Sequence, residues 1–294
     1  MMNLFRKKEE KKSDFEIEDE NDEESDEYIQ QLRVNLSRMI IYAESADVSL
    51  QREVAEKLAN EAVKSNRQVQ IVEYGGLQLL VPLTKSTDPE VQRLAAHALA
   101  NLSVTTENQV KMAQEGAIEM LVDLLDSKHE LIQRQSAKAL ANLGVNADNK
   151  RRIAESGGIP GLIRLAKNST LAVKIEAIAA IANLAVNDDN ETEIVREGGL
   201  EPIVRCAGLA AEGMEEAGGK TTLSQRELDN LEELGAQCAR SLRNLSVNPR
   251  NKNDIISLGA IPHLLVFVKS RNDRISQQAR RALRNLDAEP ASRK

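Results

Sequence analysis

The chain has 294 residues, a formal net charge of −7 and very few aromatic side chains: three Phe, three Tyr and no Trp. A core built from Leu, Ile, Val and Ala packs readily between helices, so the composition favours an all-helical fold. No apolar run approaches the roughly 18 to 20 residues that a membrane-spanning helix needs, which argues against membrane insertion.

The first segment, residues 1–27, is predicted to be a disordered and mostly acidic tail. It carries five Lys or Arg against twelve Asp or Glu, so the acidity of the chain belongs to this tail. The stretch DFEIEDENDEESDE, residues 14–27, has too little apolar surface to fold alone. It either keeps the protein soluble or folds back into a basic groove, with Phe15 and Ile17 as anchors. Ser13, which precedes acidic residues, has the surroundings of an acid-directed phosphorylation site.

The rest of the chain repeats with a period of 41 residues. Asparagines within similar stretches, such as Asn142 in SAKALANLGVN, recur at intervals of 41, 41, 41, 61 and 41 residues. These are Asn60, Asn101, Asn142, Asn183, Asn244 and Asn285. A second series consists of Gly75, Gly116, Gly157, Gly198 and Gly259. Because both series lengthen by 20 residues at the same place, one insertion has entered one copy of an otherwise regular unit.

Each unit is predicted to form three helices. A short first helix, such as NKRRIAES from Asn149, ends at a glycine that can adopt the left-handed conformation. The second helix, as in GIPGLIRLAKN, buries one apolar stripe. That stripe consists of Ile159, Leu162, Ile163 and Leu165. The third and longest helix, as in ELIQRQSAKALANLGV, has a similar stripe and a polar face. Its stripe consists of Ile132, Ala139, Leu140 and Leu143, and its polar face of Arg134, Lys138 and Asn142.

Six units are predicted within residues 28–291, followed by a short tail at 292–294. Their approximate bounds are 26–66, 67–107, 108–148, 149–189, 190–250 and 251–291. The first unit is degenerate, as the end cap of a solenoid should be. Val34 replaces its glycine, and its apolar places are filled by Leu36, Met39, Ile40 and Tyr42. The insertion, residues 208–229 in the fifth unit, is rich in glycine and acids and is predicted to be a loop.

The two repeated motifs resemble those of armadillo-repeat proteins. These motifs are the Gly-[Gly/Ala]-[Ile/Leu] start of the second helix and the AL-x-NL of the third, as in ALANLSV and ALANLGV. They keep register over residues 26–291, and the resemblance implies an all-α, right-handed armadillo solenoid of about six three-helix repeats. The chain is similar to the beta-catenin and vacuolar armadillo-protein branches. It differs from the importin-alpha group, which places Trp four residues before the asparagine, because it has no Trp and carries Arg or Lys there in three units, at Lys138, Arg240 and Arg281.

Stacked units leave a concave groove lined by the third helices, and we expect this groove to be basic. Positions four and eight before each asparagine lie on the same helix face and often carry a cation. The cations are Arg52, Arg93, His97, Arg134 and Lys138 in the first half, and Arg240 and Arg281 in the second, with Arg243 and Arg284 alongside. Ile175 and Ala179 separate the two patches. The alternative is an ordinary solvated helix face.

The family's ladder asparagines hold the backbone of an extended peptide, because an amide both donates and accepts hydrogen bonds. The resemblance carries this role to Asn101, Asn142, Asn183, Asn244 and, with less support, Asn60 and Asn285. An asparagine that only ties neighbouring helices together is the alternative. A basic groove resembles the beta-catenin branch and implies an extended acidic segment of a protein partner. The expected function is a non-enzymatic adaptor or scaffold.

Catalysis is not expected, and neither a cofactor nor a metal site is predicted. The histidines, His97, His129 and His263, belong to different units and have no recurring nucleophile beside them. Cys206 and Cys238 occupy apolar helix positions typical of small core residues.

Two other functions are left open. A nucleic-acid-binding armadillo protein is disfavoured because aromatic stacking platforms are nearly lacking. A docking factor or subunit of a larger assembly would use the convex face or the inserted loop. The charged start of the chain is no secretory signal, so we expect a cytoplasmic or nuclear protein.

Overall fold

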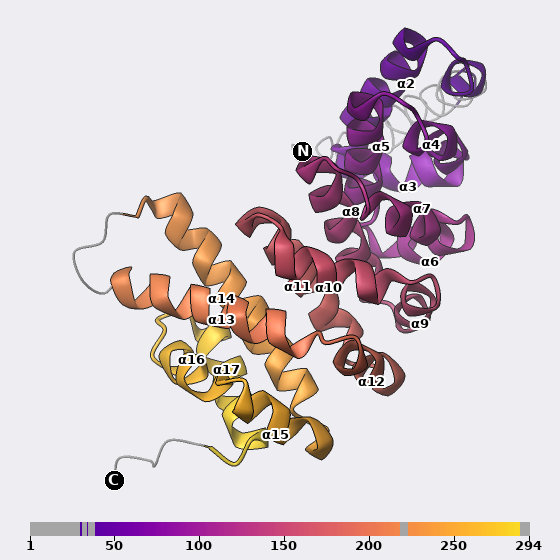
Figure 1. The fold of residues 1–294 in the computed structure, drawn as a ribbon. Coiled ribbons are helices and arrows are strands. Elements are labelled where there is room, and N and C mark those ends of the chain that lie inside the picture. Colours follow the sequence, from indigo (N-terminus) through magenta and orange to yellow (C-terminus); the bar gives the residue numbers. More distant parts are fainter. Residues whose placement is uncertain (1–29, 31–33, 35–38, 218–222, 289–294) are drawn as a thin grey trace, which may run out of the picture.

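The structure is a computed structural model that describes residues 30, 34, 39–217 and 223–288. The acidic tail and the proposed phosphorylation site at Ser13 lie outside these residues. Within them, every regular element is a helix, and the first and last units lie at opposite ends of the molecule (Figure 1). None of these helices combines the length and the apolar character that a membrane crossing requires.

The helices follow the predicted three-helix units. The first unit contributes its third helix, α2 (Val48–Ala62), after a helical stretch at 39–43. The second comprises α3 (Ser65–Glu73), α4 (Gly76–Thr84) and α5 (Pro89–Leu102). The third comprises α6 (Thr106–Gln114), α7 (Ala117–Leu124) and α8 (Glu130–Leu143). The fourth comprises α9 (Ala147–Glu155), α10 (Gly158–Asn168) and α11 (Leu171–Leu184). The fifth comprises α12 (Asp188–Arg196), α13 (Leu200–Ala217) and α14 (Gln225–Leu245), and the sixth α15 (Pro249–Ser257), α16 (Ala260–Val268) and α17 (Asp273–Asn285).

A left-handed glycine precedes the second helix of the units, as the sequence predicts. The five glycines of the repeated series have φ between 76° and 86°. At Gly157 no atom lies within 4 Å of where a Cβ would be, so the backbone conformation alone selects glycine there. The adjacent Gly158 is selected by space, because a Cβ there would lie 2.7 Å from Cγ2 of Ile153.

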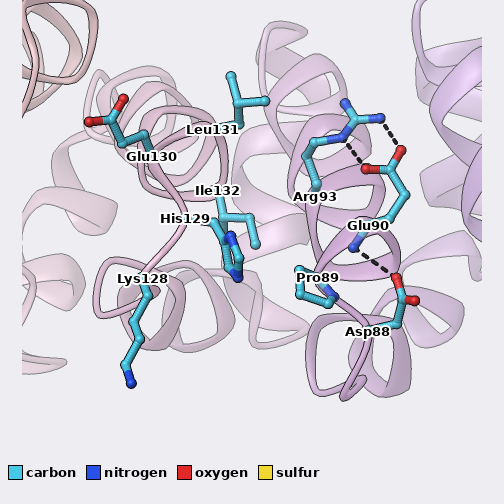
Figure 2. A pocket seen from close by; sticks show the side chains of 9 residues that line it. All are labelled: Asp88, Pro89, Glu90, Arg93, Lys128, His129, Glu130, Leu131 and Ile132. Atoms are coloured by element: carbon cyan, nitrogen blue, oxygen red, sulfur yellow. Dashed lines mark hydrogen bonds and ion pairs between the residues drawn. The ribbon is translucent and has the colours of Figure 1, made fainter.

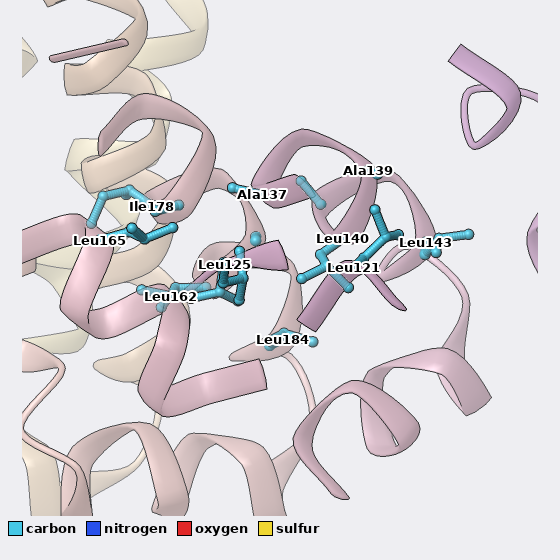
Figure 3. Packing of buried hydrophobic residues seen from close by; sticks show 14 of the residues in the cluster. Leu121, Leu125, Ala137, Ala139, Leu140, Leu143, Leu162, Leu165, Ile178 and Leu184 are labelled. Atoms are coloured by element: carbon cyan, nitrogen blue, oxygen red, sulfur yellow. The ribbon is translucent and has the colours of Figure 1, made fainter. Parts of the chain in front are cut away.

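One continuous apolar core runs from Met39 to Leu286 through the units. Figure 3 shows its middle, where Leu140 of α8, Leu162 of α10 and Ile178 of α11 belong to the same cluster. The stripes predicted for the second helix of the fourth unit and the third helix of the third unit are buried throughout. The third helices α2, α5, α8, α11, α14 and α17 pack against one another in sequence, so they form an unbroken row. We call the surface of this row the third-helix face.

A second series of asparagines, which the sequence analysis did not single out, ties the first helices together. Asn108, Asn149, Asn190 and Asn251 are at most 6% exposed and repeat at 41, 41 and 61 residues. Asn149 Nδ2, for example, donates to the carbonyls of Gln109 (3.1 Å) in the preceding unit and Leu143 (3.2 Å) in its own. Because a buried carbonyl without a partner is costly, this ladder fixes the spacing between units.

The insertion in the fifth unit is helical over most of its length, so the predicted loop was wrong. Helices α13 and α14 are 18 and 21 residues long and form an extended antiparallel hairpin (Figure 1). Its glycines allow close approach: a Cβ at Gly213 would overlap Leu231, and one at Gly208 would lie 3.2 Å from the His263 ring. Gly208 and Gly213 therefore serve helix packing.

The described part of the first unit also departs from the prediction. Met39 is buried as expected, but Ile40 and Tyr42 are 37% and 41% exposed. Ala43 is buried instead, one helical turn after Met39, and Leu36 lies outside the described residues. Residues four apart lie on the same helix face, so Met39 and Ala43 share the buried face and Ile40 and Tyr42 do not.

Candidate functional site

The ladder asparagines lie on the third helices, and most of them contact the preceding unit. Asn183 and Asn244 donate to the carbonyls of Ala141 (2.7 Å) and Ala182 (2.8 Å). Asn142 Nδ2 donates to Ser103 Oγ at 3.1 Å. Each acceptor belongs to the preceding third helix or its C-terminal cap. These amides therefore tie the third helices together, which is one of the two roles considered from the sequence.

The ladder continues at both ends with different partners. Asn285 Nδ2 donates to the Arg243 carbonyl and to Ser246 Oγ, both at 3.1 Å. Asn101 Nδ2 lies 3.2 Å from His97 Nε2 on its own helix. Asn60 is exposed. Since an amide has a carbonyl as well as an NH2 group, the inter-unit bonds leave acceptor capacity on the third-helix face.

The arginines in the first half of the third-helix face have internal carboxylate partners. Arg52 pairs with Asp88 of the next unit, Nη2 to Oδ2, at 2.8 Å. Arg134 Nε lies 3.6 Å from Glu176 Oε1 on the neighbouring α11. Arg93 pairs with Glu90 one turn before it on α5, at 2.5 Å. The positive patch predicted for this half is thus largely neutralised, which corrects the expectation of a basic surface there.

Lys138 and His97 lie beside these pairs. No carboxylate of the described residues lies within ion-pair distance of Lys138, although its charge, like that of Arg134, works against the raised pKa of Glu176. Burial is the main cause of that raised pKa. Burial, followed by the charges of Arg93 and Lys138, lowers the pKa of His97. His97 therefore adds little positive charge to the face near neutral pH.

The second half of the face is different, because four arginines gather there without carboxylate partners. These are Arg240 and Arg243 on α14 and Arg274 and Arg281 on α17, which we call the arginine cluster. Within the described residues, no carboxylate lies within 4.0 Å of any of their guanidinium groups. Helices α14 and α17 pack directly on each other.

The arginines of the cluster influence one another across the two helices. Burial lowers the pKa of Arg240, and the charges of Arg274 and Arg243 lower it further. Burial also lowers the pKa of Arg243, with Arg281 adding to the effect. The charge of Glu233 raises the pKa of Arg240 and so opposes these effects, but it is the smallest of the four contributions. Like charges are therefore held together in a partly desolvated place.

Arg274 was missed by the sequence analysis, as were the acids that neutralise the first half. Arg274 lies eleven residues before Asn285, and eleven residues is three helical turns. Glu90 and Glu233 occupy the same position before Asn101 and Asn244. Positions four and eight residues before each asparagine cover only two turns, and the position one turn further back holds all three residues.

A row of exposed valines accompanies the asparagines. The third residue after five of the ladder asparagines is a valine between 57% and 68% exposed. These are Val63, Val104, Val145, Val186 and Val247. Residues three apart in a helical turn are neighbours, so each valine lies beside its asparagine. A single exposed valine is ordinary, but five at equivalent positions form a repeated apolar feature.

A cavity of about 540 Å³ lies between the N-terminal ends of α5 and α8 (Figure 2). The paired Arg93 and Glu90 lie on one side of it, and His129 and Leu131 on the other. Its lining mixes polar and apolar side chains.

The described residues offer no metal site, because no group of three or more His, Cys, Asp or Glu side chains converges in that part of the chain. The three histidines lie on α5, before α8 and on α16. Both cysteines are buried, and burial raises the pKa of each thiol. Such thiols react slowly because the thiolate is disfavoured.

Stacked three-helix units with a left-handed glycine before the second helix and a row of third helices define an α-solenoid of the protein-interaction class. The Armadillo/beta-catenin-like repeat matches residues 65–104, 105–145, 146–186 and 248–286, more than half of the chain. The chain belongs to the armadillo-repeat family. The stretch between the last two matches contains the extended hairpin.

Solved structures of engineered and designed proteins resemble the chain. An engineered protein is 30% identical in sequence, with a TM-score of 0.72. The match covers 87% of this chain and 58% of the engineered protein. A designed armadillo repeat protein has 25% identity and a TM-score of 0.72, covering 85% and 99%. Another, in complex with the peptide (KR)4, has 25% identity and a TM-score of 0.69, with the same coverage. No curated protein sequence matches the chain significantly.

Proposed function

We propose that this protein is a non-enzymatic scaffold that holds an extended acidic segment of a partner protein along its third-helix face. The observation that carries the proposal is the contrast between the two halves of that face. Arg52, Arg93 and Arg134 have internal carboxylates, whereas the arginine cluster has none within the described residues. Acidic side chains of the partner would supply the missing charges over α14 and α17.

The ladder asparagines would hold the backbone of the segment. The NH2 groups of Asn142 and Asn183 bond the preceding unit, so the carbonyl oxygens of these two would accept hydrogen bonds from the backbone N–H groups of the partner. Neighbouring helix axes are about 8 to 10 Å apart, and an extended chain advances about 3.3 Å per residue. Successive asparagines would therefore meet the segment every two to three residues. The exposed valines beside them would contact its apolar side chains.

The sign of the charges decides which peptide binds. The designed relative in complex with (KR)4 holds a basic peptide. In this chain the uncompensated side chains over α14 and α17 are cations, which would repel such a peptide. In the first half the arginines have internal carboxylates and Lys138 alone lacks one among the described residues, so we assign most of the ligand charge selection to the second half.

The test is a binding titration with two peptides of opposite charge. The acidic probe is a fluorescent peptide of residues 14–27, and the basic probe is (KR)4. We expect the full chain to bind the acidic probe, with affinity falling as salt rises, and to bind the basic probe at least about tenfold more weakly. Equal binding of both peptides would contradict the charge assignment.

Two variants locate the site. The double variant Arg274→Glu with Arg281→Glu should lower the affinity for the acidic probe at least about tenfold. Both side chains are exposed and belong to the cluster. The matched control is Arg151→Glu, since Arg151 is exposed on α9 and pairs only with residues of its own helix. Circular dichroism confirms folding of each variant. Unchanged binding in the double variant would place the site elsewhere.

A second candidate function uses the α13–α14 hairpin to dock the protein into a larger assembly. It is favoured by the length of this hairpin and by Leu209, which is 43% exposed on α13. Glu212, Glu215 and Glu216 make the hairpin acidic, so its partner would be basic. The test is the recovery of partner proteins from cells with each variant. If Leu209→Ser abolishes this recovery and the arginine variants leave it unchanged, docking through the hairpin replaces the first proposed function.

A further inference from the structure

A cavity of about 240 Å³ lies between α10, the start of α11 and α13. It is found where the insertion begins. Leu209 of α13 is in register with Asn168, the last residue of α10, but α13 continues to Ala217. The turns of α13 after Leu209 therefore have no counterpart in α10, and Leu209 is 43% exposed at the open side of the cavity.

The inner wall of this cavity is apolar and firmly held. Ala166 of α10 and Cys206 of α13 are 1% and 2% exposed. The Cys206 thiol donates to the Ala166 carbonyl at 3.6 Å, which links the two helices at this point. Pro202, one turn before Cys206, lines the cavity and is also buried. Together with Leu209, these residues offer a surface that an apolar group would cover favourably.

The cavity also carries an excess of positive charge, because Lys167, Lys174 and Arg205 line it. Lys167 Nζ and Arg205 Nη1 share the carboxylate of Glu201, at 3.2 and 3.7 Å. Within the described residues, no carboxylate lies within 4.0 Å of the Lys174 ammonium group. Burial raises the pKa of the Cys206 thiol, and the charges of Lys174 and Arg205 oppose this rise. The two cations therefore act on the apolar wall itself.

We propose that this cavity binds the C-terminal residue of a partner protein, with its apolar side chain against Leu209 and its free carboxylate facing Lys174 and Arg205. Pockets for drug-sized ligands measure about 300 to 1,000 Å³, so this smaller cavity suits a single side chain. A terminal residue carries its side chain and its carboxylate on the same carbon atom, and lysine and arginine hold a carboxylate by charge-assisted hydrogen bonds. The rest of the partner chain can leave through the open side. This inference does not depend on the segment proposed for the third-helix face.

The chemistry differs from that of the hairpin docking considered above, although Leu209 is common to both. Docking through the acidic hairpin requires a basic partner, whereas the cavity requires a carboxylate. Lys174 belongs to α11 and not to the hairpin, so a substitution of Lys174 separates the two.

The experiment titrates the full chain with fluorescent peptides that differ only at their C-terminal end. The first is GSGSGL with a free carboxylate. Its C-terminal amide lacks the charge, and GSGSGG with a free carboxylate lacks the apolar side chain. A neutral dye on the N-terminus leaves the carboxylate as the only charge of the probe. We expect fluorescence anisotropy to show at least about tenfold tighter binding of the first peptide than of either other one.

Two positions test the two halves of the cavity. Lys174→Gln should reduce the preference for the free acid over the amide to about twofold or less, and Lys174→Arg should keep most of it because the charge remains. Leu209→Ser should reduce the preference for leucine over glycine, since an apolar wall is lost. Neither residue is buried, so these variants should fold. The matched control, Arg151→Gln, should leave both preferences intact.

Three outcomes would overturn the inference. The first is equal affinity for the acid and the amide, and the second is a preference for the acid that survives in Lys174→Gln. The third is displacement of the probe by 4-methylpentanoate at concentrations no higher than the Kd of the probe, because the ligand would then be a small free acid and not a protein terminus.

One variant keeps this inference distinct from the proposed function. Arg274→Glu with Arg281→Glu should bind GSGSGL like the unmodified chain, because neither residue lines the cavity. A loss of binding in this variant would place the probe at the arginine cluster and contradict the inference. Failure of the acidic probe of residues 14–27 to bind would remove the proposed function and leave the cavity assignment standing.

Discussion

Asn183 on α11 donates its side-chain amide to the backbone carbonyl of Ala141 on α8, at 2.7 Å. The residue that accepts this bond immediately precedes the ladder asparagine of the unit before. The same relationship joins Asn244 to Ala182, and Asn285 to Arg243. The ladder asparagines are therefore structural links between units as well as candidate contacts for a bound segment.

The first prediction concerns the stability that this link provides. Asn183→Ala should lower the free energy of unfolding by about 1 kcal/mol, the usual net value of one such hydrogen bond. Asn60→Ala is the matched control, because Asn60 occupies the equivalent position but is exposed and makes no hydrogen bond to another unit within the described residues. Its effect should stay within about 0.5 kcal/mol. Urea unfolding followed by circular dichroism measures both, and equal losses would contradict the structural role.

The fold could be predicted from the sequence because repetition gives the same information several times. A single short apolar stretch is ambiguous, but motifs that keep a 41-residue register fix the unit, its glycine turn and its buried stripes together. The insertion escaped this logic since it occurs once. Gly208 and Gly213 were interpreted as loop residues, whereas a sequence cannot show that each faces a close neighbour in a helix pair.

The candidate site could be predicted only in part. Positions on the third helices followed from helical spacing, and all six asparagines lie where expected. The charge balance did not follow, because the partners of Arg52 and Arg134 belong to neighbouring units and are 36 and 42 residues away in sequence. Contacts of this kind depend on how the units stack.

The second prediction concerns the buried asparagine ladder. Asn149→Ala removes two hydrogen bonds to backbone carbonyls, so it should cost about 2 to 3 kcal/mol, more than Asn183→Ala. Asn149→Asp should be worse at neutral pH, since a carboxylate cannot donate and would be buried beside two carbonyl oxygens. Urea unfolding at pH 7 ranks the three variants. A milder effect of Asn149→Asp than of Asn149→Ala would show that the site tolerates charge and refute this reasoning.

The third prediction separates two reasons for adjacent glycines. Gly157→Ala places a side chain at φ 79° in open space, so its cost should be the conformational one of about 1 to 2 kcal/mol. Gly158→Ala should cost more, because its Cβ would lie 2.7 Å from Cγ2 of Ile153 and 2.8 Å from the Ile153 carbonyl oxygen. Gly157→Asn should recover part of the loss, since asparagine tolerates the left-handed region. Thermal melts compare the three, and equal effects of the two alanine variants would refute the distinction.

The fourth prediction concerns the pH dependence of stability at His97. Burial, with help from Arg93 and Lys138, holds its pKa below the ordinary value of 6.5 in the folded state. As pH falls through 6.5, the unfolded chain takes up a proton more readily than the folded one, so stability should decrease. His97→Gln should remove this part of the pH dependence.

Urea unfolding of both proteins at several pH values between about 7.5 and 5.5 tests this linkage. Glu176 and Glu191 have raised pKa values owing to burial, so their protonation acts in the opposite direction and favours the folded state as pH falls. Both residues are present in the two proteins, and the difference between the two curves isolates His97. That difference should shrink as pH falls, because the native protein loses stability that the variant keeps. A difference that stays constant over this range would mean that His97 titrates alike in the folded and unfolded chains, contrary to its position between Arg93 and Lys138.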